Sequence, residues 1–170
     1  SQWNLESFLE SGTRLLKRMP DAIPPHWMTS IESRSTVLPL PMRFPDLPSD
    51  RFSEPAPESR AKGPIILWNH RWEHDKQPDV FFELIEGLYS RNIPFRLAVC
   101  GESFRKVPPA FEHAQHRFAD HIVHWGYGTA ATYAELLGQA HIAVSTAAHE
   151  FFGIAMLEAL YGGAYPLVPN

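Results

Sequence analysis

From position 64 onward, short apolar runs alternate with amphipathic segments of helical length. An apolar run that ends in polar or glycine residues predicts a buried parallel strand. Apolar residues that recur every three or four positions predict a helix. We expect strands at 64–68, 95–100, 122–125, 142–145 and 164–168. We expect helices at 78–90, 109–118, 129–138 and 152–161.

This alternation predicts an α/β domain over 64–170. Strands and helices that follow one another at this spacing form βαβ units and an open parallel sheet. The expected fold is therefore a Rossmann-like doubly wound parallel sheet. Such a sheet normally covers its last strand with another helix. Because the chain stops at Asn170, we expect this domain to be truncated at its C-terminus.

The first part of the chain has a different pattern. Apolar residues at helical spacing predict a helix over 3–19, with Asn4 as its cap. Most of the 16 prolines fall between 20 and 64, which argues against regular helix or central strand there. We expect one short strand near 36–40. We interpret 1–40 as the remnant of an N-terminal domain and 41–63 as a proline-rich interdomain linker.

Composition narrows the class of protein. The 15 basic and 19 acidic residues give a net charge of −4, which argues against a polybasic nucleic-acid binder. The single cysteine, Cys100, excludes a disulfide framework and fits a reducing compartment. We find neither a leader sequence nor an apolar run of the ~20 residues that a membrane helix needs. The expectation is a cytoplasmic protein without membrane contact.

Candidate chemistry lies in the turns that follow the strands, where open α/β sheets bind ligands. The G-x-G-x-x-G and P-loop patterns are absent, which argues against standard nicotinamide or ATP enzymes. The first turn carries Arg71 and Lys76, a guanidinium fork and a point charge that suit a diphosphate. The alternative is a polar surface loop whose charges are structural.

Two histidines in the same turn, His70 and His74, have the i, i+4 spacing that could bind a metal on a helix. Neither a cysteine nor an H-E-x-x-H frame accompanies them. We therefore expect a site without a metal ion.

The turn before the last helix is the most specific feature. Gly153 allows close backbone approach, and the helix N-terminus after it offers free N–H groups to a phosphate. Glu158 lies in an otherwise apolar segment, so it either pairs with a cation or binds ligand hydroxyls. Glu150 lies on the same rim; the two acids could also suit glycoside hydrolysis. Cations, a helix N-terminus and two carboxylates together favour a sugar nucleotide.

These motifs resemble the C-terminal, donor-binding half of a GT-B enzyme of the family 4 glycosyltransferases. The resemblance rests on Arg71-x4-Lys76, on Glu150-x7-Glu158 and on the Gly126-Tyr127 turn. The amino-acid sequence at 65–76, 124–127, 149–159 and 37–46 is similar to that of the tRNA-queuosine α-mannosyltransferase group. This resemblance covers nearly the whole chain.

The resemblance implies catalytic roles for three residues. Arg71 and Lys76 would hold the donor diphosphate and offset the charge of the departing nucleotide, and Glu150 would bind the transferred sugar. The implied reaction is retaining transfer of mannose from GDP-mannose to queuosine in tRNA, without a metal or cofactor.

The resemblance also implies donor-binding roles outside that group. Backbone N–H groups of Phe152 and Gly153 would meet phosphate, and Glu158 would bind the ribose hydroxyls. Tyr127 would lie near the base.

In this family the N-terminal domain carries the acceptor site, and little of it is found in this chain. We therefore expect weak donor binding without transfer, with the tRNA surface in the absent domain. An unpartnered helix at 3–19 favours a domain-swapped dimer. The alternatives are another family 4 enzyme with a different donor and acceptor, or a non-catalytic module that binds nucleotide sugars. A sugar-nucleotide epimerase lacks support from the motifs.

Overall fold

The computed structural model describes residues 1–20, 24, 26–48, 61–103 and 107–169. The chain divides into two compact units, Ser1–Arg43 and Phe44–Asn170. Each unit is described here by itself.

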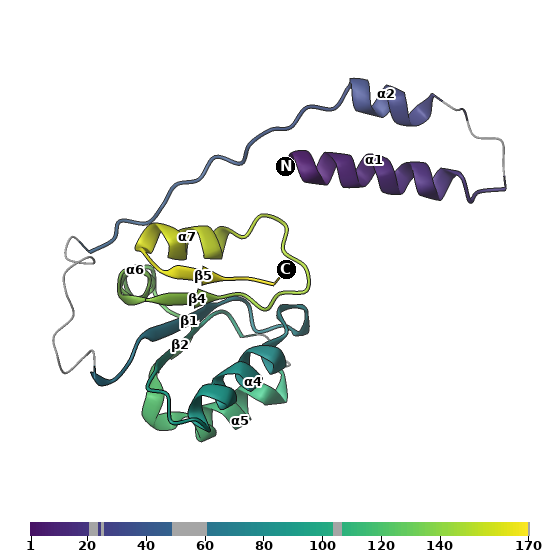
Figure 1. Ribbon diagram of the computed structural model, residues 1–170. Helices are drawn as coiled ribbons and strands as arrows, with labels where there is room; N and C mark the ends of the chain where they lie inside the picture. Colours follow the sequence, from purple (N-terminus) through teal and green to yellow (C-terminus); the bar gives the residue numbers. More distant parts are fainter. Residues whose placement is uncertain (21–23, 25, 49–60, 104–106, 170) are drawn as a thin grey trace. The chain divides into compact units, whose positions relative to one another are not determined.

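The larger unit is built on a parallel sheet of five strands (Figure 1). The strands are β1 (Ile65–Asn69), β2 (Arg96–Cys100), β3 (Ile122–Gly126), β4 (Ile142–Val144) and β5 (Tyr165–Leu167). Their order in the sheet is β3-β2-β1-β4-β5, and every neighbouring pair is parallel. This arrangement confirms the α/β fold with a Rossmann-like parallel sheet that the sequence predicts.

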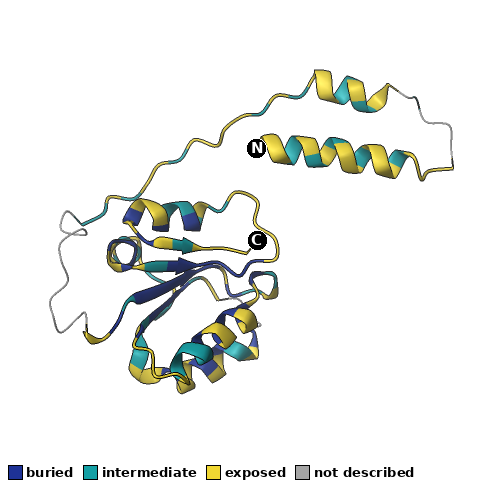
Figure 2. Ribbon diagram, in the orientation of Figure 1, coloured by how far each residue is buried: buried dark blue, intermediate teal, exposed yellow. Residues whose placement is uncertain are grey.

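Helices cover both faces of the sheet. The helical elements are η1 (His74–Lys76), α4 (Pro78–Tyr89), α5 (Pro109–Arg117), η2 (Ala119–His121), α6 (Ala130–Gln139) and α7 (Ile154–Gly162). One apolar cluster joins the sheet to α4 and α5, and a second joins it to α6 and α7. Figure 2 shows the buried residues concentrated in the sheet between these layers.

Strand β1 shows how sequence periodicity assigns side chains to the two layers. Ile66 and Trp68 belong to the cluster beneath α4 and α5, whereas Ile65 and Leu67 belong to the cluster beneath α6 and α7. Successive residues of a strand point to opposite faces. Asn69 therefore follows Leu67 toward α6 and α7, which matters for the site described below.

Helix α7 begins two residues later than the sequence predicts. Gly153 is its N-cap and has a φ of 77°, in the left-handed region that favours glycine. The preceding Phe152 is a bend rather than the first helical residue. The chain turns sharply at Gly153, so the helix cannot extend back through it.

The smaller unit differs from expectation in three respects. Helix α1 (Gln2–Leu16) is capped by the Ser1 side chain rather than by Asn4. Helix α2 (Trp27–Ser33) occupies part of the stretch where proline content argued against any helix. No proline lies between positions 26 and 38, so this segment is free of the constraint. The strand expected near 36–40 is not formed, since these residues are extended without a ladder partner among the described residues.

Helices α1 and α2 pack on each other but bury little. Met28 of α2 lies against Gly12 of α1, where an added Cβ would come within 2.7 Å of the methionine methyl group. The helix over 3–19 was expected to be unpartnered, and α2 is its partner. Neither α1 nor α2 contains a buried residue, as Figure 2 shows.

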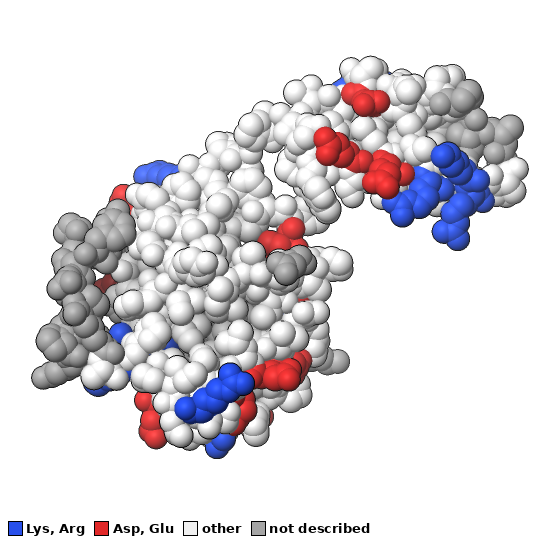
Figure 3. Space-filling view, in the orientation of Figure 1, with Lys and Arg blue, Asp and Glu red and all other residues white. Residues whose placement is uncertain are grey.

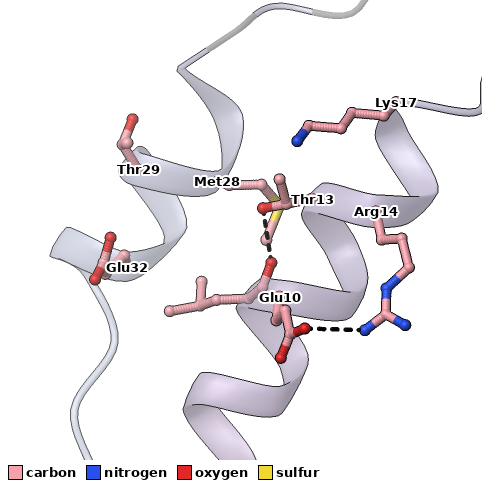
Figure 4. Close-up of a pocket in the computed structure, with 8 residues that line it drawn as sticks. Glu10, Thr13, Arg14, Lys17, Met28, Thr29 and Glu32 are labelled. Atoms are coloured by element: carbon pink, nitrogen blue, oxygen red, sulfur yellow. Dashed lines mark hydrogen bonds and ion pairs between the residues drawn. The ribbon is translucent and has the colours of Figure 1, made fainter.

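An open groove of ≈ 510 Å³ runs between α1 and α2 (Figure 4). Arg14 forms an ion pair with Glu10 at 3.2 Å on one side, and Thr13 donates to the carbonyl of Leu9 at 2.8 Å. All these contacts are local to α1, at i, i+4 spacing. The groove is lined only by residues of the smaller unit.

Part of the expected linker belongs to the larger unit. The Phe44 ring stacks on Tyr161 of α7 with centroids 4.5 Å apart, and Leu47 packs against the cluster beneath α6 and α7. Residues 49–60 of the expected linker lie outside the described residues. None of the helices in the described ranges has the length and apolarity that crossing a bilayer requires.

Candidate functional site

The strand order of the sheet reverses between β1 and β4, which lie side by side at its centre. The loops that follow these two strands leave from the same edge, the one where open α/β sheets bind ligands. One loop runs from His70 to Gln77, and the other from Ser145 to Gly153. Both contain residues that the sequence singles out.

Hydrogen bonds join these two loops directly. The Ala148 N–H donates to the Asp75 carbonyl at 2.9 Å, and the Thr146 hydroxyl donates to the Lys76 carbonyl at 2.8 Å. The indole N–H of Trp68 donates to the Thr146 oxygen at 3.3 Å. The loops are therefore fixed to each other and to the buried end of β1.

The structure brings Lys76 and Glu150 together across these loops. The Lys76 side chain is 10% exposed, and its Nζ lies 3.4 Å from Glu150 Oε2. The same ammonium group lies 3.1 Å from the His149 carbonyl oxygen and 3.3 Å from Asp75 Oδ2. Three acceptors thus surround a nearly buried cation, and the two carboxylates among them reach solvent.

Arg71 lies at the same edge but keeps its own partner. Its guanidinium forms an ion pair with Glu73 at 3.1 Å, and its side chain is 57% exposed. An exposed ion pair of this kind contributes little to stability and exchanges readily with an incoming anion. The expected cation pair is therefore present as one nearly buried and one exposed group.

His70, the first residue of the loop after β1, is 6% exposed and has an edge-to-face contact with the Trp68 ring. Burial is the main cause that lowers its pKa to about 4, so the imidazole is neutral near pH 7. Its Nε2 has no hydrogen-bond partner among the described residues. A Cβ on Gly101 would overlap the His70 carbonyl oxygen, so the ends of β1 and β2 are in close contact here.

His74 belongs to η1 whereas His70 precedes it, so the two histidines do not share a helical face. Within the described ranges, no three His, Cys, Asp or Glu side chains are grouped as metal ligands would be.

Glu158, on α7, is held by a neutral group rather than by a cation. The Tyr133 hydroxyl of α6 donates to Glu158 Oε2 at 2.7 Å. The Asn69 amide donates to the Tyr133 oxygen at 3.0 Å and to the Ala155 carbonyl at 2.9 Å. Burial, followed by the hydrogen bond to Glu158, raises the pKa of Tyr133 well above its ordinary value. The phenol is therefore protonated at any physiological pH.

The remaining predicted residues lie along the same edge. Helix α7 begins at Ile154, and its N-cap Gly153 has no capping side chain, so the first turn presents backbone N–H groups. Phe152, just before it, is 43% exposed. Tyr127 follows β3 and is 78% exposed. No contact between described residues links Tyr127 to the Lys76–Glu150 pair.

Two residues of this edge, Asn69 and Tyr133, are absent from the sequence-based set. Each could have been found from periodicity. Asn69 is the polar residue that continues the Ile65, Leu67 face of β1, and Tyr133 is one turn before the buried Leu137 on α6. Their meeting with Glu158 depends on how α6 packs against α7.

A surface ion pair elsewhere on the larger unit joins α4 to α5. Figure 3 shows basic and acidic side chains next to each other on this unit. Arg117 of α5 bonds Glu86 of α4 through two hydrogen bonds, at 2.8 Å and 3.0 Å. That bond lowers the pKa of the Glu86 carboxyl. Such exposed pairs tie neighbouring helices together weakly.

Comparison with models of protein families identifies the family of this chain. The model of the family described as "Glycosyl transferases group 1" matches residues 49–170. The chain therefore belongs to the group 1 glycosyltransferase family. A second model, "tRNA-queuosine alpha-mannosyltransferase N-terminal", matches residues 1–42.

A curated relative from Drosophila melanogaster, named tRNA-queuosine alpha-mannosyltransferase, is 37% identical over 173 residues. The match covers 100% of this chain and 46% of the relative, so the chain spans about half of that protein's length. This similarity confirms the resemblance to the tRNA-queuosine α-mannosyltransferase group.

Solved structures of glycosyltransferases share the fold. A glycosyltransferase from Rickettsia africae is 20% identical with a TM-score of 0.51, covering 73% of this chain and 36% of that chain. Sucrose-phosphate synthase from Thermosynechococcus elongatus is 18% identical with a TM-score of 0.52, covering 74% and 31%. These neighbours support the placement of the sheet as half of a GT-B architecture.

Proposed function

We propose that this chain is the donor-binding part of a retaining glycosyltransferase that moves mannose from GDP-mannose to queuosine in tRNA. The observation that carries the proposal is the Lys76–Glu150 contact at the strand-order reversal, with Glu158 held at the same edge. The 37% identity to the fly enzyme supports the acceptor and the sugar.

Lys76 and Arg71 bind the diphosphate of the donor. Two of the three acceptors around Lys76 Nζ are carboxylates at 3.3 Å and 3.4 Å, longer than an optimal charged hydrogen bond. Phosphate oxygens can replace them without leaving the ammonium unsatisfied. Arg71, exposed and weakly paired, turns to the same phosphates and supplies a bidentate fork.

The two carboxylates accept hydrogen bonds from hydroxyl groups of the donor. Glu150 binds the transferred sugar beside Lys76, and Glu158 binds the ribose. Backbone N–H groups at Phe152 and Gly153 face a phosphate at the start of α7. Tyr127 lies near the base. This order places sugar, diphosphate and nucleoside in sequence along one edge of the sheet.

Catalysis in this arrangement is positioning and electrostatics. The bond between the anomeric carbon and the diphosphate breaks as the acceptor hydroxyl oxygen bonds to that carbon. The hydroxyl proton passes to the departing diphosphate, on which negative charge grows. Lys76 and Arg71 offset that charge. The nearly buried position of Lys76 strengthens its effect, because little water screens it.

The acceptor tRNA is bound outside this chain's sheet unit. The net charge of −4 is poorly suited to a polyanion, and the chain spans less than half of the fly relative. We therefore expect the 170-residue chain to bind donor weakly and to transfer no mannose. Incubation with labelled GDP-mannose and queuosine-containing tRNA tests this; measurable turnover would contradict it.

Calorimetric titration with GDP-mannose, GDP and UDP-glucose tests the donor. GDP-mannose and GDP should bind, and UDP-glucose should bind more weakly. Arg71→Ala should weaken GDP binding about tenfold, as expected for one charge-assisted contact. Arg117→Ala, which removes an exposed cation paired with Glu86, is the matched control and should change nothing. Binding unaffected by Arg71→Ala would remove Arg71 from the site, and tighter UDP-glucose binding would overturn the donor.

A further inference from the structure

We propose that Tyr133 is a positioning residue that, together with Asn69, orients the Glu158 carboxylate to bind the two hydroxyls of a ribose. The inference rests on the proposed function in taking the ligand to be a nucleoside diphosphate. It adds two residues, neither of them among the predicted site residues, to the group that determines how the nucleoside half of the donor is held.

The direction of the hydrogen bonds is fixed by chemistry. The Asn69 amide nitrogen carries only donors, so the Tyr133 oxygen, 3.0 Å away, must accept from it. The single phenol proton is then free to donate to Glu158 Oε2 at 2.7 Å. A relay therefore runs from the end of β1 through α6 to α7. Bonds that share one direction in this way strengthen one another.

Burial gives the relay its rigidity. Asn69 is 6% exposed, and Tyr133 packs against the apolar cluster beneath α6 and α7. The phenol stays protonated across physiological pH because its pKa is raised, so the donor to Glu158 is always present. The relay works as a fixed support rather than as a switch.

Asn69 also fixes the helix that carries the carboxylate. Its second amide proton donates to the Ala155 carbonyl at 2.9 Å, in the first turn of α7. Asn69, at the end of β1, thus holds the α7 backbone directly and the Glu158 side chain through Tyr133. The remaining Asn69 oxygen is buried and has no partner among the described residues.

The Glu158 carboxylate keeps the capacity that a ribose needs. One lone pair of Oε2 accepts from Tyr133, and the other lone pairs of the two oxygens are available for further donors. Two neighbouring hydroxyls can donate to one carboxylate whose rotation is already fixed. Fixing the side chain before binding lowers the entropy lost when the ligand is held.

The experiment compares GDP with 2′,3′-dideoxy-GDP, which lacks both hydroxyls, by calorimetric titration of the full chain. The wild type should bind GDP more tightly than the dideoxy compound. Tyr133→Phe should weaken GDP binding about five- to tenfold, the effect of one hydrogen bond to a charged group. It should leave dideoxy-GDP binding unchanged within about twofold, since that ligand makes no contact with Glu158.

Tyr165→Phe is the matched control, because it removes a phenol oxygen from β5 at a position that is 68% exposed. It should leave both affinities unchanged. If Tyr133→Phe weakens both ligands equally, the residue acts on general stability and the positioning role is overturned. If it changes neither, the role is overturned while the donor site stands. If the wild type binds neither ligand, the proposed function is wrong, and this inference with it.

A measurement on the unsubstituted chain covers the case in which Tyr133→Phe does not fold. With ¹³C at the tyrosine Cζ positions, the Tyr133 resonance should shift on adding GDP and stay in place on adding dideoxy-GDP. An equal response to the two nucleotides would overturn the inference. Tyr89, Tyr161 and Tyr165, which the proposal places outside the nucleotide site, serve as internal references.

Discussion

The two ends of the candidate site are held by different kinds of contact. At one end, Lys76 is surrounded by acceptors at 3.1–3.4 Å, two of which are carboxylates that reach solvent. At the other, Glu158 receives a 2.7 Å hydrogen bond from a phenol that is itself fixed by Asn69. The first end can exchange its partners for those of an anion. The second keeps its geometry and offers unused lone pairs.

Lys76→Met should have the largest effect, because it leaves Glu150 and Asp75 without their shared cation. Removing one member of a buried ion pair costs about 3–5 kcal/mol, and the partial exposure of both carboxylates places this case near the lower figure. Urea denaturation measures the loss, and GDP binding should disappear in calorimetry. Lys62→Met, at an exposed lysine, is the control. An unchanged unfolding free energy together with unchanged GDP affinity would show that Lys76 has no such role.

His70 should make stability depend on pH at the exchangeable end. Its pKa is about 4 in the folded chain and 6.5 as the ordinary value, so between these pH values the unfolded chain binds more protons. Stability from this group is complete above about pH 6.5 and is lost as the pH falls toward 4, by up to about 3 kcal/mol.

Urea denaturation at several pH values checks this expectation. His70→Phe should flatten the profile between pH 4 and 6.5, whereas His116→Phe, at an exposed position on α5, should not. Parallel profiles for the wild type and His70→Phe would assign the pH dependence to other groups.

Tyr127→Ala tests whether the site extends to the turn after β3. Because the side chain is 78% exposed, its removal should change stability by less than about 0.5 kcal/mol. GDP affinity should fall about threefold to tenfold through loss of stacking on the base, an effect of roughly 1 kcal/mol. Equal GDP affinity in the variant and the wild type would show that the site does not include Tyr127.

The smallest expected effect concerns the other unit. Trp3 and Phe8 of α1 are 72% and 57% exposed, so we expect a concentration-dependent, domain-swapped dimer of this chain. Light scattering should show the mass rising toward twice the monomer value with concentration, and Trp3→Ser should reduce that rise. A constant monomer mass would contradict the expectation.

The sequence predicts the sheet unit well because each of its elements has a strong local pattern. Strand β1 begins with an apolar run over 65–68, and α4 begins at a proline, Pro78, which is favoured in the first helical turn. The smaller unit is predicted less well. Proline density suggested no helix, yet α2 forms in the proline-free interval, and 36–40 stays extended because no strand in the described residues pairs with it.

For the site, the motifs identify the charged groups but not their supports. Lys76 and Glu150 are 74 residues apart, and their meeting follows from two loops leaving adjacent strands. The Tyr133 contact with Glu158 depends on the packing of two helices, which a single sequence does not encode at the level of one oxygen atom. The sequence therefore predicts the charged residues of the site but not the hydrogen bonds between packed helices and strands.

The bonds between the β1 and β4 loops have a consequence for engineering. The Asp75 carbonyl accepts from Ala148, and the Lys76 carbonyl accepts from Thr146, so each segment is a template for the other. If only one loop were grafted from a homologue, its conformation would no longer match that of the other loop, and these hydrogen bonds would be lost. A chimera with altered sugar preference should therefore carry both segments as a single transplanted cassette.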